Sequence, residues 1–98
     1  MLDYAQISKI AGAAARSHLE TKSVATVSAE PAVDSEGHDA LRITIVLKPG
    51  AATELSGDAV LDTLVDIQER LQRAGELRFP IIDYAAEDEL EIGGDSQP

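Results

Sequence analysis

The stretch from Ala40 to Lys48, which reads ALRITIVLK, alternates between apolar and polar residues with a single interruption. The apolar residues that share one side are Leu41, Ile43, Ile45 and Leu47. The opposite side carries Arg42, Thr44, Lys48 and, as the interruption, Val46. A period of two with β-branched residues is typical of a strand with one buried face. Because such a face must be covered, the chain is constrained to form a half-covered sheet with helices on its apolar side.

Periodicity and turn residues divide the rest of the chain into further elements. Helices are predicted over residues 3–20 and 56–74, and strands over 22–30, 41–48 and 78–84. The polar stretch 34–39 contains a glycine and is predicted to be a hairpin loop between the first two strands. Residues 85–92 are a candidate for a final helical turn.

The predicted helices carry recognisable end signals. Asp3 and Ser56 are candidate N-caps, and Gly75 follows the second helix. The apolar stripe of the first helix consists of Ile7, Ile10, Ala11, Ala14 and His18. The stripe of the second consists of Val60, Leu64, Ile67, Leu71 and Ala74, widened by Leu61 and Val65. Pro31 either ends the first strand or marks it as an edge strand.

The order α-β-β-α-β predicts an α+β fold, a two-layer sandwich. We expect a small, mostly antiparallel sheet with two helices on one face. Since a crossover through a helix is right-handed, the third strand should return parallel to the second. The 98 residues are enough for one domain. That domain is predicted over residues 1–92, and 93–98 are predicted to be a disordered C-terminal tail.

The formal net charge is −10, and much of it lies at the C-terminus, because residues 83–98 include six acids and no Lys or Arg. Nucleic-acid affinity depends on Lys and Arg that neutralise phosphates, so this composition argues against nucleic acid as a partner. It favours a protein partner with a basic surface, or simply solubility. The eight basic residues are interpreted as part of a mixed, solvated surface.

The chain has no cysteine, which excludes disulfides, thiolate metal sites and a cysteine nucleophile. Its first residues, MLDYAQISKI, lack the basic region and the long apolar region of a signal peptide. No apolar run approaches the roughly 18 residues of a membrane span. We therefore expect a cytoplasmic protein that does not bind a membrane.

Two groups of polar residues invite a chemical interpretation. The hairpin loop contains Asp34, Glu36, His38 and Asp39, whose side chains could hold a cation. An exposed hairpin tip is the commoner explanation for them. His18 can be combined with Ser23 or Ser28 and an acid into a catalytic triad, but no GxSxG elbow supports this. The sequence therefore predicts no catalytic, cofactor-binding or metal-binding residue.

We expect a non-enzymatic protein-interaction module, acting as an accessory, regulatory, inhibitor-like or antitoxin-like subunit. Its binding surface is either the acidic C-terminal segment or the open face or edge of the sheet, and an exposed edge also allows a homodimer. The candidate partner-binding residues are Tyr84, Glu87, Asp88, Glu89, Leu90, Glu91, Arg42 and Thr44.

Two alternatives remain open. One is a nucleic-acid-associated α+β domain, although the polar sheet face is expected to lack the aromatic residues on which bases stack. The other is a small ligand-binding or enzymatic domain. It would have a pocket between the first helix and the sheet, where small alanines leave room.

Overall fold

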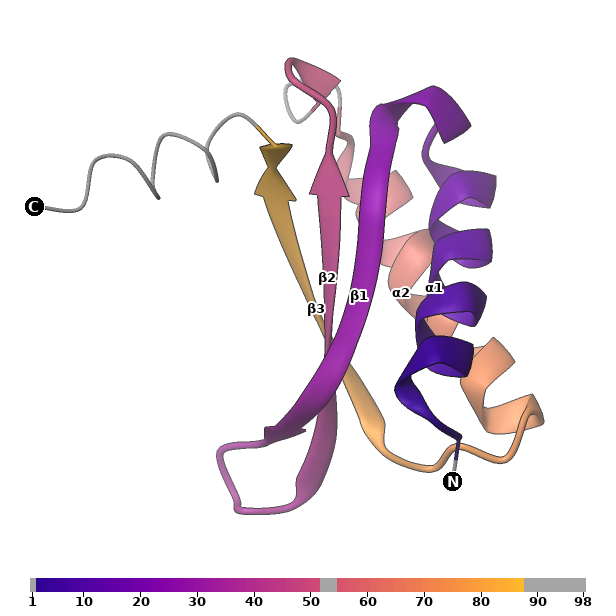
Figure 1. Ribbon diagram of the computed structural model, residues 1–98, viewed down its shortest axis with the longest axis vertical. Coiled ribbons are helices and arrows are strands. Elements are labelled where there is room, and N and C mark those ends of the chain that lie inside the picture. The colour runs from indigo at the N-terminus through magenta and orange to yellow at the C-terminus, as the bar shows by residue number, and fades with distance from the viewer. Residues whose placement is uncertain (1, 52–54, 88–98) are drawn as a thin grey trace, which may run out of the picture.

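The computed structural model describes residues 2–51 and 55–87 of the chain. Its elements are α1 (Tyr4–His18), the short 3-10 helix η1 (Thr21–Ser23), β1 (Val24–Val33), β2 (Asp39–Leu47), α2 (Gly57–Arg73) and β3 (Phe79–Ala86). The predicted order α-β-β-α-β is confirmed. Figure 1 shows α1 and α2 side by side on one face of the sheet, so the fold is the expected two-layer α+β arrangement.

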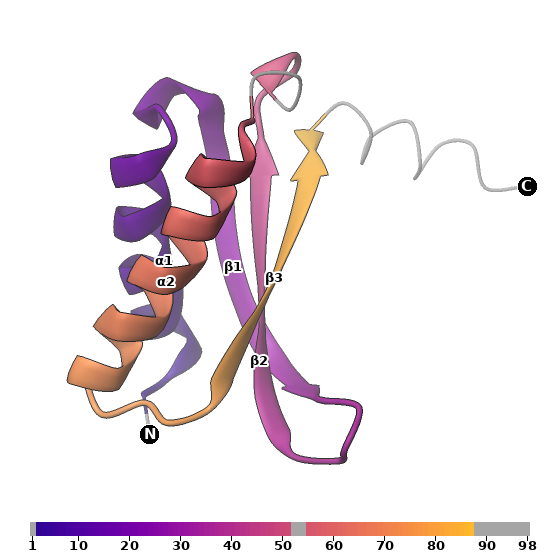
Figure 2. The ribbon, with the colours of Figure 1, turned by 180° about the vertical axis from the view of Figure 1, so that it is seen from behind.

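The strand β2 lies in the middle of the sheet, whose order is β1-β2-β3. β1 and β2 form an antiparallel hairpin, whereas β3 runs parallel to β2. The parallel return of the third strand is confirmed, so the sheet is mixed, with one pair of each kind where a mostly antiparallel sheet was expected. This return follows from α2, which runs back along the sheet from the end of β2 to the start of β3 (Figure 2).

The alternating residues of β2 form the centre of the core, as predicted. Leu41, Ile43, Ile45 and Leu47 expose at most 1% of their surface. The helices cover them with Ile7, Ala11, Ala14, Ala15, Ile67 and Leu71. Small residues let α1 lie close to β1, since a Cβ added at Gly12 would be only 3.9 Å from Val27 Cβ.

Side chains at the helix ends satisfy the backbone groups that a helix leaves unpaired. The Asp3 carboxylate accepts a hydrogen bond from the Gln6 N–H at 2.8 Å, and the Gln6 side chain accepts one from the Asp3 N–H at 3.3 Å. The Ser56 hydroxyl accepts a hydrogen bond from the Ala59 N–H at 3.0 Å. Gly75 follows α2 with a φ of 96°, which favours glycine. All three predicted end signals are confirmed.

The buried stripe of α2 differs from the prediction. Thr63 is buried with Ile67 and Leu71, whereas Leu61 is 58% exposed and Val65 is 46% exposed. Burial of the Thr63 hydroxyl is tolerated because it donates a hydrogen bond within the helix, to the Ala59 carbonyl at 2.7 Å. Including Leu61 and Val65 in the core was therefore wrong, and they lie on the outer surface of α2.

Two strands extend further than predicted. β1 continues through Pro31, which is tolerated because β1 is an edge strand. β3 extends beyond the predicted residue 84 to Ala86, because Ala85 and Ala86 pair with Val46 and Leu47 of β2. The helical turn predicted over residues 85–92 is therefore wrong for these two residues. The rest of that turn from residue 88, and the predicted disordered tail 93–98, lie outside the described residues.

A buried ion pair ties the start of the chain to the loop between α2 and β3. Glu76 is 1% exposed, and its carboxylate accepts hydrogen bonds from the Leu2 N–H at 3.1 Å and from Arg78 Nε at 2.8 Å. The Arg78 guanidinium also donates to Tyr4 Oη at 3.0 Å. The hydrogen bonds from Arg78 lower the pKa of Glu76 from 4.5 to about 2. This cluster fixes α1 against the start of β3.

Candidate functional site

The face of the sheet that points away from α1 and α2 carries no other element in the described part of the chain (Figure 1). We call it the open face. The strand register places on it Thr26, Ser28 and Glu30 of β1, Arg42, Thr44 and Val46 of β2, and Ile81, Asp83 and Ala85 of β3. Two of the predicted partner-binding residues, Arg42 and Thr44, thus lie together at its centre.

An ion pair crosses the open face between β2 and β3. Arg42 Nε lies 3.6 Å from Asp83 Oδ2, and both side chains are about half exposed, at 48% and 51%. An exposed pair of this kind contributes about 1 kcal/mol or less to stability. The pair therefore contributes little to holding the strands together, and both groups remain accessible from solvent.

The open face also has an aliphatic part. Val46, Ile81 and Ala85 are only partly buried, because no helix covers them in the described structure. Phe79, which is 51% exposed, pairs with Ala40 and so lies on the same face as Arg42. The expectation that this face has no aromatic residue is therefore wrong for Phe79. Sequence reasoning missed it because the polar face was taken from β1 and β2 alone.

Tyr84 does not belong to this surface, although it was predicted to bind a partner. The register pairs it with Ile45, on the helix side of the sheet. Its phenol oxygen is buried and has no hydrogen-bond partner among the described residues. Burial raises the pKa of Tyr84. Because β3 pairs with β2 without a register shift and successive side chains of a strand point to opposite faces, Tyr84 points to the helix side while its neighbour Asp83 points to the open face.

The acidic segment begins where β3 ends. Glu87 follows the last residue of β3 directly and is exposed. The other predicted binding residues of this segment, Asp88, Glu89, Leu90 and Glu91, lie outside the described residues. Their role stays a prediction.

Three of the four candidate ligands in the hairpin loop come together. Ligand atoms of Asp34, Glu36 and His38 all lie within 4.8 Å of one another, at an exposed position. The Asp34 carboxylate is already engaged, since it accepts hydrogen bonds from the Glu36 N–H at 2.8 Å and from the His38 N–H at 2.9 Å. The His38 N–H in particular lowers the pKa of Asp34. Asp39 instead belongs to β2 and pairs with Val33. These bonds explain the cluster as a tight hairpin turn.

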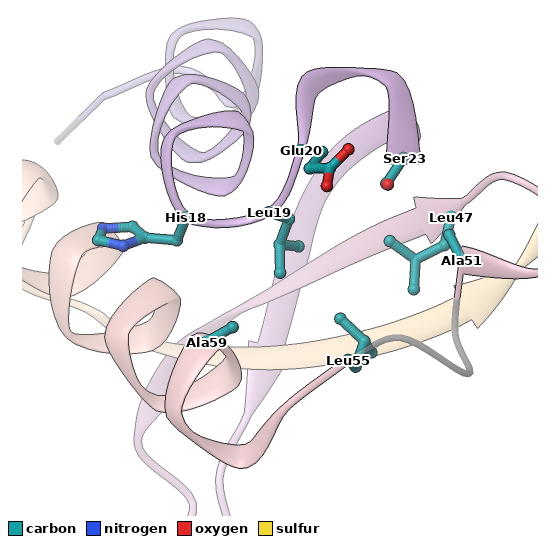
Figure 3. Close-up of a pocket in the computed structure, with 8 residues that line it drawn as sticks. All are labelled: His18, Leu19, Glu20, Ser23, Leu47, Ala51, Leu55 and Ala59. Atoms are coloured by element: carbon teal, nitrogen blue, oxygen red, sulfur yellow. The ribbon is translucent and has the colours of Figure 1, made fainter.

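A cavity of about 180 Å³ lies between the end of α1, the end of β2 and the start of α2 (Figure 3). Its apolar lining consists of Leu19, Leu47, Ala51, Leu55 and Ala59. Glu20 and Ser23 add polar groups on one side. The His18 ring points away from them toward α2, where its Nε2 lies 2.9 Å from Asp66 Oδ2.

The described residues contain no assembled serine–histidine pair. Ser23 lies on the far side of the cavity from the His18 ring, and Ser28 lies on the open face. Placing His18 on the apolar stripe of the first helix was wrong, because its side chain is exposed and pairs with Asp66. The alanines Ala11 and Ala14 of α1 are fully buried and pack in the hydrophobic core. The cavity lies instead beyond the end of α1.

A comparison with protein-family models, with curated proteins and with solved structures finds no match for this chain. Within the described ranges, no helix combines the length and the apolar character that crossing a membrane requires.

Proposed function

We propose that this protein is a small non-enzymatic protein-interaction module with an accessory, regulatory or inhibitor-like role. It docks on a partner protein through the open face of its sheet, together with the acidic segment that follows β3. The observation that carries this proposal is the open face itself. A solvated sheet face needs no aliphatic side chains, yet this face carries Val46 and Ala85 paired on neighbouring strands, and Ile81 beyond Asp83 on β3.

The charges of the open face favour a partner with a basic surface. Glu30 and Asp83 lie on this face and Glu87 follows β3, whereas Arg42 already pairs with Asp83. The segment that continues from Glu87 adds further acids. Charge complementarity of this kind speeds association and selects partners rich in Lys and Arg. That the chain is cytoplasmic, is not an enzyme, and binds no cofactor, nucleic acid or membrane stays a prediction.

The test is retention of a partner from cell extract by immobilised full-length protein, read by mass spectrometry. The open-face variant replaces Ser28 and Thr44 with Arg, which reverses the local charge without touching the core. The matched control replaces Leu61 and Val65 with Arg, because these residues are exposed on the outer surface of α2. Circular dichroism verifies that both variants fold.

The proposal expects a stoichiometric partner with a basic surface that the wild type and the α2 control retain. The open-face variant should lose it, and rising salt should release it from the wild type. Equal retention by all three proteins would remove the open face as the docking site. A further variant replaces Asp88, Glu89 and Glu91 with Asn, Gln and Gln. If only this variant loses the partner, the binding site is the acidic segment alone.

The cavity beyond α1 favours small-ligand binding as a second candidate function. Its volume of about 180 Å³ suits only a small molecule, and its walls are mostly apolar. A metabolite that raises the melting temperature of the wild type, but not that of Leu55→Trp, would support this alternative. A flat response across a broad metabolite library would argue against it.

A further inference from the structure

A shallow groove runs between α1 and α2 on the outer side of the helix layer. Its lining consists of Lys9, Ile10, Ala13, Arg70, Arg73 and Ala74, and its volume is about 460 Å³. The two helices run in opposite directions, which brings the first half of α1 beside the end of α2 (Figure 2). From the sequence, these basic residues were interpreted as part of a mixed, solvated surface, because nothing in the sequence shows which turns of the two helices meet.

The groove is lined by positively charged side chains, although the chain as a whole is strongly negative. Lys9 and Arg73 are exposed, and neither forms an ion pair within residues 2–51 and 55–87. Arg70 uses its Nε to contact Asp66 Oδ1 at 2.9 Å. In a chain of net charge −10, three cations thus surround an apolar floor made by Ile10 and two alanines. Such a groove is complementary to a segment that alternates acids with aliphatic side chains.

We propose that this groove binds the acidic segment of a second copy of the chain, residues 87–92, so that the protein associates with itself. That segment reads EDELEI and combines four acids with Leu90 and Ile92. The acids pair with Lys9 and Arg73, and the two aliphatic side chains lie on the floor of the groove. This inference goes beyond the proposed function, because the open face takes no part in it.

The reach of the chain requires the segment to come from a second copy. β3 ends at the same end of the molecule as the start of α2, whereas the groove lies near the end of α2 (Figures 1 and 2). From Gly57 to Arg70 the helix rises about 20 Å, at roughly 1.5 Å per residue. The three residues from Glu87 to Leu90 span at most about 10 Å when fully extended. Leu90 therefore cannot enter the groove of its own copy.

Charge exchange in the full-length protein tests the proposal, with sedimentation equilibrium as the readout. The groove variant is Lys9→Glu with Arg73→Glu, and the segment variant is Glu89→Lys with Glu91→Lys. The matched control, Lys22→Glu with Lys48→Glu, changes the net charge as the groove variant does, at exposed positions outside the groove. Circular dichroism verifies the fold of each protein.

The wild type and the control should self-associate, more weakly as salt rises. Either charge variant should weaken self-association by about tenfold or more, as expected for loss of complementary charges at an interface. Mixing the groove variant with the segment variant should restore association, because the exchanged charges are again complementary. Restoration is a result that a mere change of net charge or of stability would not produce.

A second measurement locates the binding site. A fluorescent peptide of residues 87–95 is titrated with full-length protein, and its anisotropy is followed. The wild type should bind the peptide, the groove variant should not, and replacing Leu90 and Ile92 in the peptide with Ser should weaken binding.

Three results would overturn the proposal: a wild type that stays monomeric at 0.2 mM, an equal loss of association in the control, or no restoration on mixing. The open-face variant leaves the groove intact, and the groove variant leaves the open face intact. Failure of the self-association proposal therefore does not refute the proposed function, and failure of the proposed function does not refute self-association.

Discussion

Replacing Glu76 with Gln tests whether one buried carboxylate fixes the N-terminus to the loop before β3. The pKa of this group is lowered from 4.5 to about 2, chiefly by hydrogen bonds from the Arg78 guanidinium. At 1.36 kcal/mol per pKa unit, the charged form contributes about 3 kcal/mol to the free energy of unfolding at neutral pH. Gln keeps one acceptor oxygen but turns an amide N–H₂ toward the donors of Arg78 and the Leu2 N–H. We therefore expect Glu76→Gln to lower the free energy of unfolding by about 2–3 kcal/mol at pH 7.

The pH dependence separates charge from packing. Because the pKa of Glu76 is lower in the folded state, its contribution is fully present above about pH 4.5 and is lost as the pH falls toward 2. Because protonation of Glu76 is linked to unfolding, roughly 1 kcal/mol of its contribution to the free energy of unfolding remains at pH 3. The difference between wild type and Glu76→Gln should therefore shrink from pH 7 to pH 3.

The assay is urea unfolding followed by circular dichroism at several pH values over this range. The control is Glu69→Gln, which removes an exposed acid that makes no ion pair within the described residues. It should change the free energy of unfolding by about 0.5 kcal/mol or less. A difference for Glu76→Gln that is the same at every pH, or that is below about 0.5 kcal/mol at pH 7, would refute the reasoning.

Three further substitutions are measured by the same urea unfolding at pH 7. Ile45→Ala should cost about 3–4 kcal/mol, because Ile45 is fully buried in the middle of β2; a cost below about 1 kcal/mol would contradict the assigned core. Ser56→Ala should cost about 1 kcal/mol by removing the hydroxyl that accepts from the Ala59 N–H, and no loss would mean that the cap is dispensable. Gly12→Ala should stabilise the protein or leave it unchanged within about 1 kcal/mol, since the one tight contact of the new methyl group is the flexible end of Arg16, at 2.7 Å. A large loss there would mean that Val27 cannot accommodate the methyl group.

The parts of the fold that could be predicted are those where a local pattern has one physical solution. The alternation from Leu41 to Leu47 admits only a strand with one buried face, and all four of its apolar residues are in the core. Asp3 and Ser56 bind the backbone of their own helices, so each cap needs no information from elsewhere in the chain. The order of these elements then fixed the parallel return of β3.

The errors occur where tertiary packing decides between local alternatives. α2 buries Thr63 rather than Leu61, because its rotation is set by contacts with α1 and β3 and not by its most apolar side. Tyr84 was assigned to a binding surface because of the acids beside it, although its position in β3 faces the helices. Lys9 and Arg73 are 64 positions apart in sequence, so their common groove depends on how α1 and α2 align.

The two proposed surfaces draw on one acidic segment, and this links them. The open face belongs to the sheet layer and the groove to the helix layer on the other side of the molecule (Figure 1). A partner bound to the open face therefore does not block the groove directly. The segment that starts at Glu87, however, cannot lie in the groove of a second copy and on a basic partner at the same time. Partner binding and self-association should therefore compete, and by linkage each should weaken the other. Adding the basic partner should dissociate the self-associated wild type; if both complexes instead form together at full occupancy, the segment serves only one of the two surfaces.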